Sequence, residues 1–249
     1  KWVIGTEGDI AKAIIRDGTV GILDRAFDGC RELEEITLPD DLAEIYGSVF
    51  NGCKKLQTIK LPEQLTVIGE NAFADCVSLE KVELPDNVIK IDDLVFSGCT
   101  SLKVLKINDG IKKIGKAAFK NCSSLTEAYI PASLIYLSTD LFRGCESLKS
   151  IRVESKNKYY KSEPNKREGS DHVLFNKNKS VIIAYPASSR EVQYDIPDSV
   201  TTIDRFASPI IQCSSETGNC SLIGFATIAT SRSAFSASST VLKFSATHN

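Results

Sequence analysis

Six cysteines recur along the chain at a constant interval of 23 residues. They stand at positions Cys30, Cys53, Cys76, Cys99, Cys122 and Cys145. A fixed period of about 20 to 29 residues is typical of solenoids, in which each repeat forms one turn that cannot bury its apolar face alone. The interval therefore predicts an elongated stack of coils and argues against an ordinary globular enzyme.

Phenylalanine and leucine keep the same step as the cysteines. One column lies three residues before each cysteine, and the other lies three residues after it. The phenylalanines are Phe27, Phe50, Phe73, Phe96, Phe119 and Phe142, and the leucines are Leu33, Leu56, Leu79, Leu102, Leu125 and Leu148. Because both columns are apolar in every unit, we expect them to fill the interior of the stack.

A single repeat shows how each coil should be built. The unit Cys76–Gly98 has the sequence CVSLEKVELPDNVIKIDDLVFSG, in which Val82 and Leu84 flank a glutamate. This alternation is the period-two signal of a short strand, and the proline that follows it ends the strand because it has no N–H to donate. Val88 and Ile91 should point inward on the second side. The third side, as in IGENAFADC, has near-helical apolar spacing, which predicts a short helix or a turn.

The pattern resembles the BspA-like leucine-rich repeats, whose consensus is roughly AFxxCxxLxxIxLPxxVxxIgxx. The resemblance extends from about Ile10 to Val153, and Ile196, Pro197, Val200 and Ile203 recover its IPxxVxxI phase further on. It implies an α/β leucine-rich-repeat solenoid with a parallel sheet on the concave face and short helices or turns on the convex face. It also implies a secreted, periplasmic or cell-surface protein of a host-associated microbe that binds other proteins.

Breaks in the period divide the chain into five segments. We expect a lead-in over residues 1–8, a repeat core over 9–153 with a degenerate first unit, and an insertion loop over 154–172 where the parallel sheet is interrupted. Divergent terminal repeats should follow over 173–207, and an off-lattice tail rich in Ser, Ala and Thr over 208–249. The insertion is either an edge loop or a functional loop carrying Tyr159 and Tyr160. The tail is a divergent cap, a flexible stalk or a terminus that has drifted from its ancestral frame.

Composition excludes several classes of function. A net charge of −2 and an isoelectric point near 5.8 give no basic excess for nucleic acid. No apolar run approaches the roughly 18 residues of a membrane helix. The chain has no methionine, so we expect it to start inside a longer precursor, whose signal peptide is not visible, or to be trimmed. We expect no cofactor.

The residues that could carry chemistry are few. With only His172 and His248 available, and no CxxC pair, we expect neither a metal site nor a catalytic centre. The six periodic cysteines should be buried packing thiols. Cys213 and Cys220 lie off the lattice, and they form either a small loop disulfide or two unpaired thiols.

What remains is the exposed side of the sheet, since successive strand residues alternate between its faces. We expect a non-catalytic module for protein–protein interaction, serving adhesion or host–microbe contact outside the cytoplasm. Tyr and Arg are favoured at binding hot spots, so Tyr129 and Arg152 are the strongest candidates. The full set of candidate binding residues is Thr37, Lys60, Glu83, Val104, Lys106, Tyr129 and Arg152.

A second hypothesis places a small hydrophobic ligand at the irregular C-terminal end. If the tail covers that end poorly, apolar side chains of the terminal repeats would be left partly uncovered, and such patches often mark binding sites. We therefore expect an apolar patch or pocket near Ile183, Ile196 and Ile203.

Overall fold

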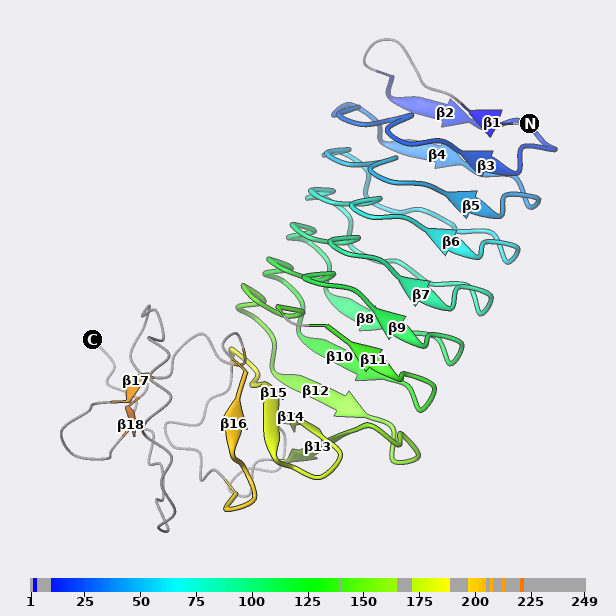
Figure 1. Cartoon of the computed structure of the whole chain (residues 1–249). Coiled ribbons are helices and arrows are strands. Elements are labelled where there is room, and N and C mark those ends of the chain that lie inside the picture. The colour runs from blue at the N-terminus through cyan, green and yellow to red at the C-terminus, as the bar shows by residue number, and fades with distance from the viewer. Residues whose placement is uncertain are drawn as a thin grey trace.

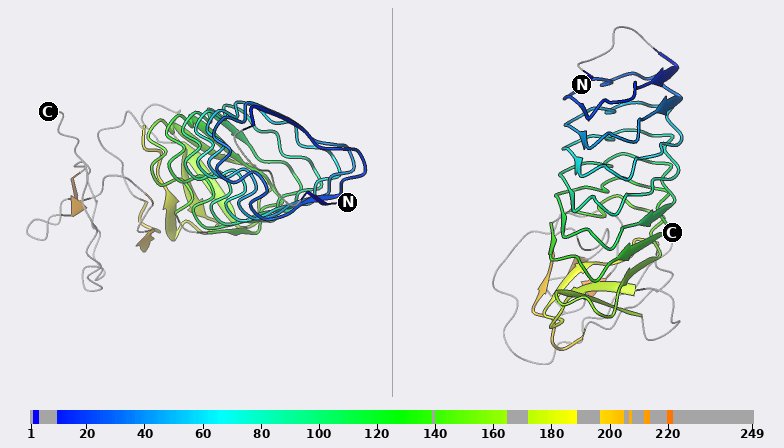
Figure 2. Two further views of the ribbon diagram at one scale, coloured as in Figure 1. Left: turned by 90° about the horizontal axis from the view of Figure 1, so that it is seen from above. Right: turned by 90° about the vertical axis from the view of Figure 1, so that its right-hand side faces the viewer.

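The computed structural model describes residues 2–3, 10–138, 140–164, 172–188, 197–204, 207, 212–213 and 220–221. Its main body is a stack of coils in which the chain advances one layer every 23 residues, so that neighbouring coils lie on top of one another (Figure 1). Viewed along the stack, successive coils nearly superimpose (Figure 2). The 23-residue interval of the cysteines is thus the length of one coil, and the predicted solenoid is confirmed.

One side of the stack carries the predicted parallel strands, which we call the first ladder. It comprises β2 (Lys12–Ile14), β4 (Glu35–Thr37), β8 (Val104–Lys106), β10 (Glu127–Ile130) and β12 (Ser150–Val153). Bridges from Thr58 to Lys81 and from Glu83 to Lys106 continue it through the coils between β4 and β8. Partners are 23 residues apart throughout, for example Ala128 opposite Ile151.

A second parallel ladder follows on the next side of each coil. Its strands are two residues long: β1 (Trp2–Val3), β3 (Gly21–Ile22), β5 (Glu44–Ile45), β6 (Val67–Ile68), β7 (Lys90–Ile91), β9 (Lys113–Ile114) and β11 (Tyr136–Leu137). We had expected only that Val88 and Ile91 would point inward here. The inward position is buried, as at Ile45, Ile68, Ile91 and Ile114, and the residue before it faces outward.

The third side of each coil consists of turns, and the part of the chain described contains no helix. The short-helix alternative is therefore not found, and the turn alternative describes this side. The reason lies in the backbone, because two positions per coil adopt the left-handed conformation, which interrupts right-handed helix. One column is Arg25, Ser48, Asn71, Leu94, Ala117 and Asp140, and the other is Gly29, Gly52, Asp75, Gly98, Asn121 and Gly144.

The interior is filled by the predicted columns. The phenylalanine rings stack from coil to coil, with centroids 5.5, 5.3, 5.5, 5.7 and 6.2 Å apart from Phe27 to Phe142. Beside them, each cysteine thiol donates to the carbonyl of a phenylalanine one coil earlier, as Cys99 Sγ does to Phe73 O at 3.2 Å. All six cysteines are buried and unbridged. They are packing residues, as the sequence predicts.

The regular lattice ends after β12. The next sheet has the order β13 (Tyr160–Pro164), β14 (His172–Asn176), β15 (Val181–Ala184) and β16 (Thr202–Ile203), and its first two pairings are antiparallel. The first ladder is therefore interrupted where predicted. Part of the segment expected to be an insertion loop is strand β13.

Asn157 explains how the chain leaves the lattice. Its buried side chain donates from Nδ2 to the carbonyls of Pro131 at 2.7 Å and Leu134 at 3.1 Å, and its Oδ1 accepts from the N–H groups of Tyr159 and Tyr160. These bonds satisfy backbone groups that an irregular coil would otherwise leave unpaired. The segment that follows Val153 is thus anchored to the last regular coil.

Little of the C-terminal tail falls within the described residues. The strands β17 (Gln212–Cys213) and β18 (Cys220–Ser221) pair antiparallel and place Cys213 opposite Cys220. A disulfide between them stays a prediction. The choice between cap, stalk and drifted terminus rests on residues outside those described, as does the division of the chain at residue 208.

Candidate functional site

The candidate site is the solvent face of the first ladder, and we call it the first-ladder face. All seven predicted residues are exposed on it: Thr37, Lys60, Glu83, Val104, Lys106, Tyr129 and Arg152. The alternation that produces this exposure is direct, since Leu105, Ala128 and Ile151 on the same strands are buried.

The structure brings part of this set together and separates the rest. Tyr129 lies between Lys106 on β8 and Arg152 on β12, with each as its direct strand partner. Val104 is the partner of Glu127 on the adjoining row and is half exposed. Thr37 and Lys60 belong to earlier coils, and Thr37 has Ile14 as its strand partner. The site as predicted is therefore concentrated on β8, β10 and β12.

Tyr129 is held in place by polar and cationic contacts. Its hydroxyl donates to Glu127 Oε2 at 3.2 Å and accepts from Arg152 Nη1 at 3.2 Å. The Arg152 guanidinium carbon lies 5.7 Å from the Tyr129 ring centroid, within the range of a cation–π interaction. These contacts fix an aromatic ring and a planar cation side by side, which limits the side-chain entropy lost when a partner binds.

Charge on this face changes along the stack. Near its start, Lys12 pairs with Glu35 at 2.9 Å, and further along Lys81 pairs with Glu83 at 2.7 Å. The hydrogen bond and charge of Lys81 lower the pKa of Glu83, so this carboxylate is ionised at neutral pH. Neither Lys106 nor Arg152 forms an ion pair with any residue that the structure describes. The end of the face is thus cationic around one aromatic residue, whereas its earlier part is self-neutralised.

One further expectation about this face is wrong. Successive rows should expose Ser150 beside Arg152, but Ser150 is only 3% exposed. His172 on β14 covers it, with 3.2 Å between Ser150 Oγ and His172 Nδ1. The cover comes from a strand beyond the lattice, which the repeat pattern does not describe.

The cysteine column offers no reactive thiol. Burial raises the pKa of Cys76 to about 12 and raises the pKa values of Cys53 and Cys99 as well, so the thiolate is not populated at neutral pH. Within the described ranges, no group of three or more His, Cys, Asp or Glu side chains is placed to hold a metal ion. The same ranges contain no helix that could span a membrane.

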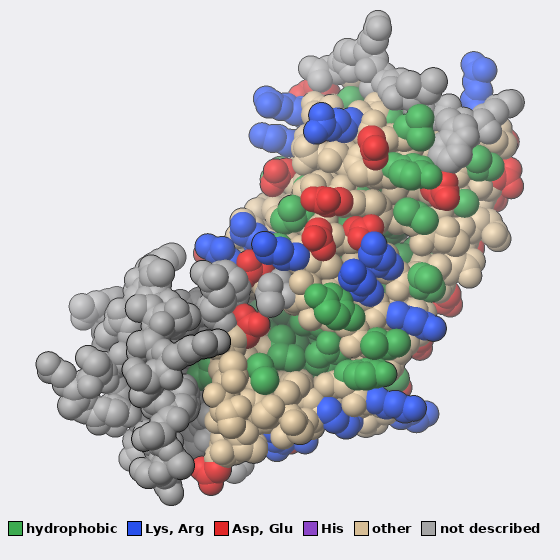
Figure 3. Space-filling model, viewed as in Figure 1, with side chains coloured by type: hydrophobic (Ala, Val, Ile, Leu, Met, Phe, Trp, Pro, Cys, Tyr) green, Lys and Arg blue, Asp and Glu red, His purple; other side chains and the backbone are tan. Residues whose placement is uncertain are grey.

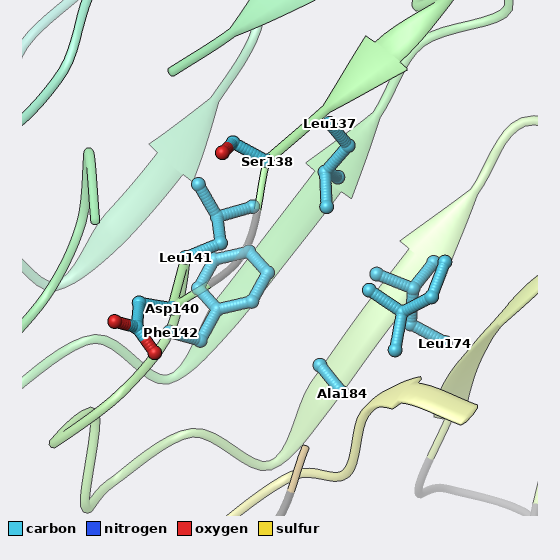
Figure 4. Close-up of a pocket in the computed structure, with 8 residues that line it drawn as sticks. Leu137, Ser138, Asp140, Leu141, Phe142, Leu174 and Ala184 are labelled. Atoms are coloured by element: carbon cyan, nitrogen blue, oxygen red, sulfur yellow. The ribbon is translucent and has the colours of Figure 1, made fainter. Parts of the chain in front are cut away.

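A small cleft lies where the solenoid meets the following sheet (Figure 4). Leu137, Asp140 and Phe142 line it from the last regular coil, and Leu174 and Ile183 line it from β14 and β15. Its volume of about 10 Å³ compares with the several hundred cubic ångströms of a typical ligand site. This cleft accommodates about one water molecule.

The predicted apolar pocket is not assembled as a unit here. Ile183 packs against the main core and lines the cleft, whereas Ile203 packs against a second cluster formed by Val173, Phe175, Ile182 and Ala207. Ile196 lies outside the described residues. A ligand pocket involving the tail stays a prediction.

The family model for the BspA type leucine rich repeat region matches the chain in six copies, over residues 7–93 and 66–185. The chain belongs to this family. The resemblance inferred from the Phe, Cys and Leu columns is confirmed, and the solenoid fold is that of BspA-type repeats. No curated protein sequence matches the chain.

Solved structures with the same fold come from bacterial leucine-rich-repeat proteins. The pneumococcal vaccine antigen PcpA has a TM-score of 0.66 and 26% identity, covering 83% of this chain and 54% of PcpA. A leucine rich cell surface protein from Faecalibacterium prausnitzii has a TM-score of 0.63 and 24% identity, covering 83% of this chain and 62% of that protein. For a leucine-rich repeat protein from Eubacterium ventriosum the values are 0.53 and 24%, covering 80% and 44%.

This chain therefore spans only part of the length of the structures it matches. Identity near one quarter supports a shared fold. Leucine-rich repeats are commonly protein-interaction modules and typically non-catalytic, and nothing in the family match or the structural matches points to an enzyme.

Proposed function

We propose that this BspA-type repeat protein is an adhesion module that binds a host protein through the first-ladder face. The observation that carries the proposal is the row formed by Lys106, Tyr129 and Arg152 on three adjacent strands. Val104 adds an exposed apolar side chain next to this row. An aromatic anchor bordered by cations that lack acidic partners among the described residues is typical of interaction hot spots.

The mechanism is complementarity of shape and charge. Each side chain of the row stands on a strand that is hydrogen-bonded to its neighbours and backed by buried residues, so the surface is preformed. Binding to a preformed surface orders few groups, which preserves more of the interaction free energy as affinity. The uncompensated cations favour a partner that presents carboxylates and also accelerate encounter with it.

The proposed location is outside the cytoplasm. The F. prausnitzii structure with the same fold is described as a cell surface protein, and PcpA is described as a vaccine antigen. An adhesion module must be displayed where host proteins are accessible. Six buried unbridged cysteines are compatible with this, because burial protects thiols from oxidation.

The test uses purified extracellular-matrix proteins immobilised as a panel. Wild-type protein should bind at least one of them, and Tyr129→Ala combined with Arg152→Ala should weaken that binding about tenfold or more. Lys12→Ala combined with Thr37→Ala, at the other end of the same face, is the matched control and should bind like wild type. Absence of binding across the panel, or equal loss in both variants, contradicts the proposal.

A further inference from the structure

The second ladder carries an exposed surface that the repeat pattern does not require. We call it the lysine–isoleucine patch, and it consists of Ile89, Lys90, Lys112, Lys113, Ile135 and Tyr136. Ile89 is 56% exposed, Ile135 is 47% exposed and Tyr136 is 51% exposed. Large apolar side chains that remain exposed together, rather than singly, are typical of interaction sites.

The patch is continuous across three coils. Lys112 N donates to Ile89 O at 2.8 Å, and Ile135 N donates to Lys112 O at 2.9 Å, so these three residues follow one another along the stack. In the adjoining column, Lys113 has Lys90 as one strand partner and Tyr136 as the other. In Figure 3, hydrophobic and basic side chains lie beside one another over β9 and β11.

Its charges are arranged differently from those of the first ladder. There, Lys12 on β2 is opposite Glu35 on β4 and forms an ion pair with it. Here, Lys90 and Lys113 are opposite one another, and like charges in this position destabilise a sheet.

Acidic partners within the protein neutralise only one lysine of the patch. Lys90 is paired with Asp92 at 2.5 Å, but Lys112 and Lys113 have no ion pair with any described residue. The Lys113 ammonium instead lies 5.3 Å from the Tyr136 ring centroid. The patch therefore combines uncompensated positive charge with exposed apolar surface.

We propose that the lysine–isoleucine patch is a second binding surface, separate from the first-ladder face, for a protein that presents carboxylates around apolar side chains. The lysines alone would suit any polyanion. The two isoleucines decide between partners, because covering them is favourable only for a partner with apolar groups of its own. A polysaccharide or nucleic acid would neutralise the lysines and leave Ile89 and Ile135 in water.

The probe is a short synthetic peptide in which glutamates alternate with leucine and phenylalanine, with polyglutamate and vesicles of anionic phospholipid as comparison ligands. The peptide should bind the full chain more tightly than polyglutamate does. Lys112→Glu combined with Lys113→Glu should weaken peptide binding about tenfold or more, and Ile89→Ser combined with Ile135→Ser should do the same. Lys106→Glu, which makes the same charge change on the first-ladder face, is the matched control.

Three results would overturn the proposal. Equal binding of peptide by wild type and both patch variants would remove the site. Equal binding of peptide and polyglutamate would leave only non-specific charge attraction. Binding of vesicles that is lost in both patch variants, without peptide binding, would assign the patch to a membrane surface instead.

Discussion

Replacing Cys99 by alanine tests the role of the cysteine column. The side chain is fully buried between coils, and its thiol donates to Phe73 O at 3.2 Å. Removing the sulfur costs the transfer free energy of one buried group, about 1 kcal/mol. The small cavity adds about 0.5 kcal/mol and the weak hydrogen bond about 0.5 kcal/mol. Cys99→Ala should therefore lower the free energy of unfolding by about 2 kcal/mol.

The assay is urea unfolding followed by circular dichroism, with Ser97→Ala as the matched control. Ser97 lies on the same turn but is only half buried, so its loss should change stability by less than about 0.5 kcal/mol. A thiol reagent should also leave Cys99 unmodified in the native protein, because burial raises its pKa well above the usual value. A Cys99→Ala protein as stable as wild type, or rapid native labelling of Cys99, would refute packing as its role.

Three other substitutions test particular features by the same unfolding assay. Arg25→Gly should stabilise by about 1 kcal/mol because Arg25 is exposed at φ 61°, and Arg25→Ala, which keeps the Cβ, should not; equal effects would contradict backbone strain. Asn157→Ala should cost about 3 kcal/mol by leaving buried backbone groups unpaired, and a cost below about 1 kcal/mol would contradict that role. Burial raises the pKa of Asp140, so the folded state retains its proton longer and wild-type stability falls as pH rises from the unfolded towards the folded pKa. Asp140→Asn should therefore gain up to about 1 kcal/mol at neutral pH and nothing in acid, and a gain in acid alone would contradict this sign.

The sequence predicts the lattice because repetition reports the same environment six times. Any column that stays apolar, such as Phe96 and its equivalents, must face the interior of every coil. The alternation around Glu83 likewise predicts which side chains of the first ladder face solvent. These inferences depend on short-range geometry alone, which each unit contains.

The second ladder was missed because its strands are only two residues long. Pairs such as Lys90–Ile91 and Lys113–Ile114 are too short to show alternation within one unit. The signal was present between units, where an outward residue precedes an inward isoleucine at the 23-residue step. Comparing columns rather than runs would also have revealed the exposed Ile89 and Ile135.

Features that depend on contacts beyond one coil could not be predicted. Burial of Ser150 requires His172, which stands on an antiparallel strand after the lattice. The turns require left-handed backbone at Leu94 and Ala117, residue types that do not indicate that conformation. The role of Asn157 depends on carbonyls of the preceding coil. In each case the deciding partner is distant in sequence and follows no period.

The most direct test of the proposed function is hydroxyl-radical footprinting of the protein alone and bound to the matrix protein that it recognises. Tyr129 reports the first-ladder face and Tyr136 the second ladder, and both side chains are exposed in the free protein. Binding through the first-ladder face predicts that oxidation of Tyr129 falls on complex formation while that of Tyr136 does not change. Protection of Tyr136 with Tyr129 unchanged would contradict the proposed function.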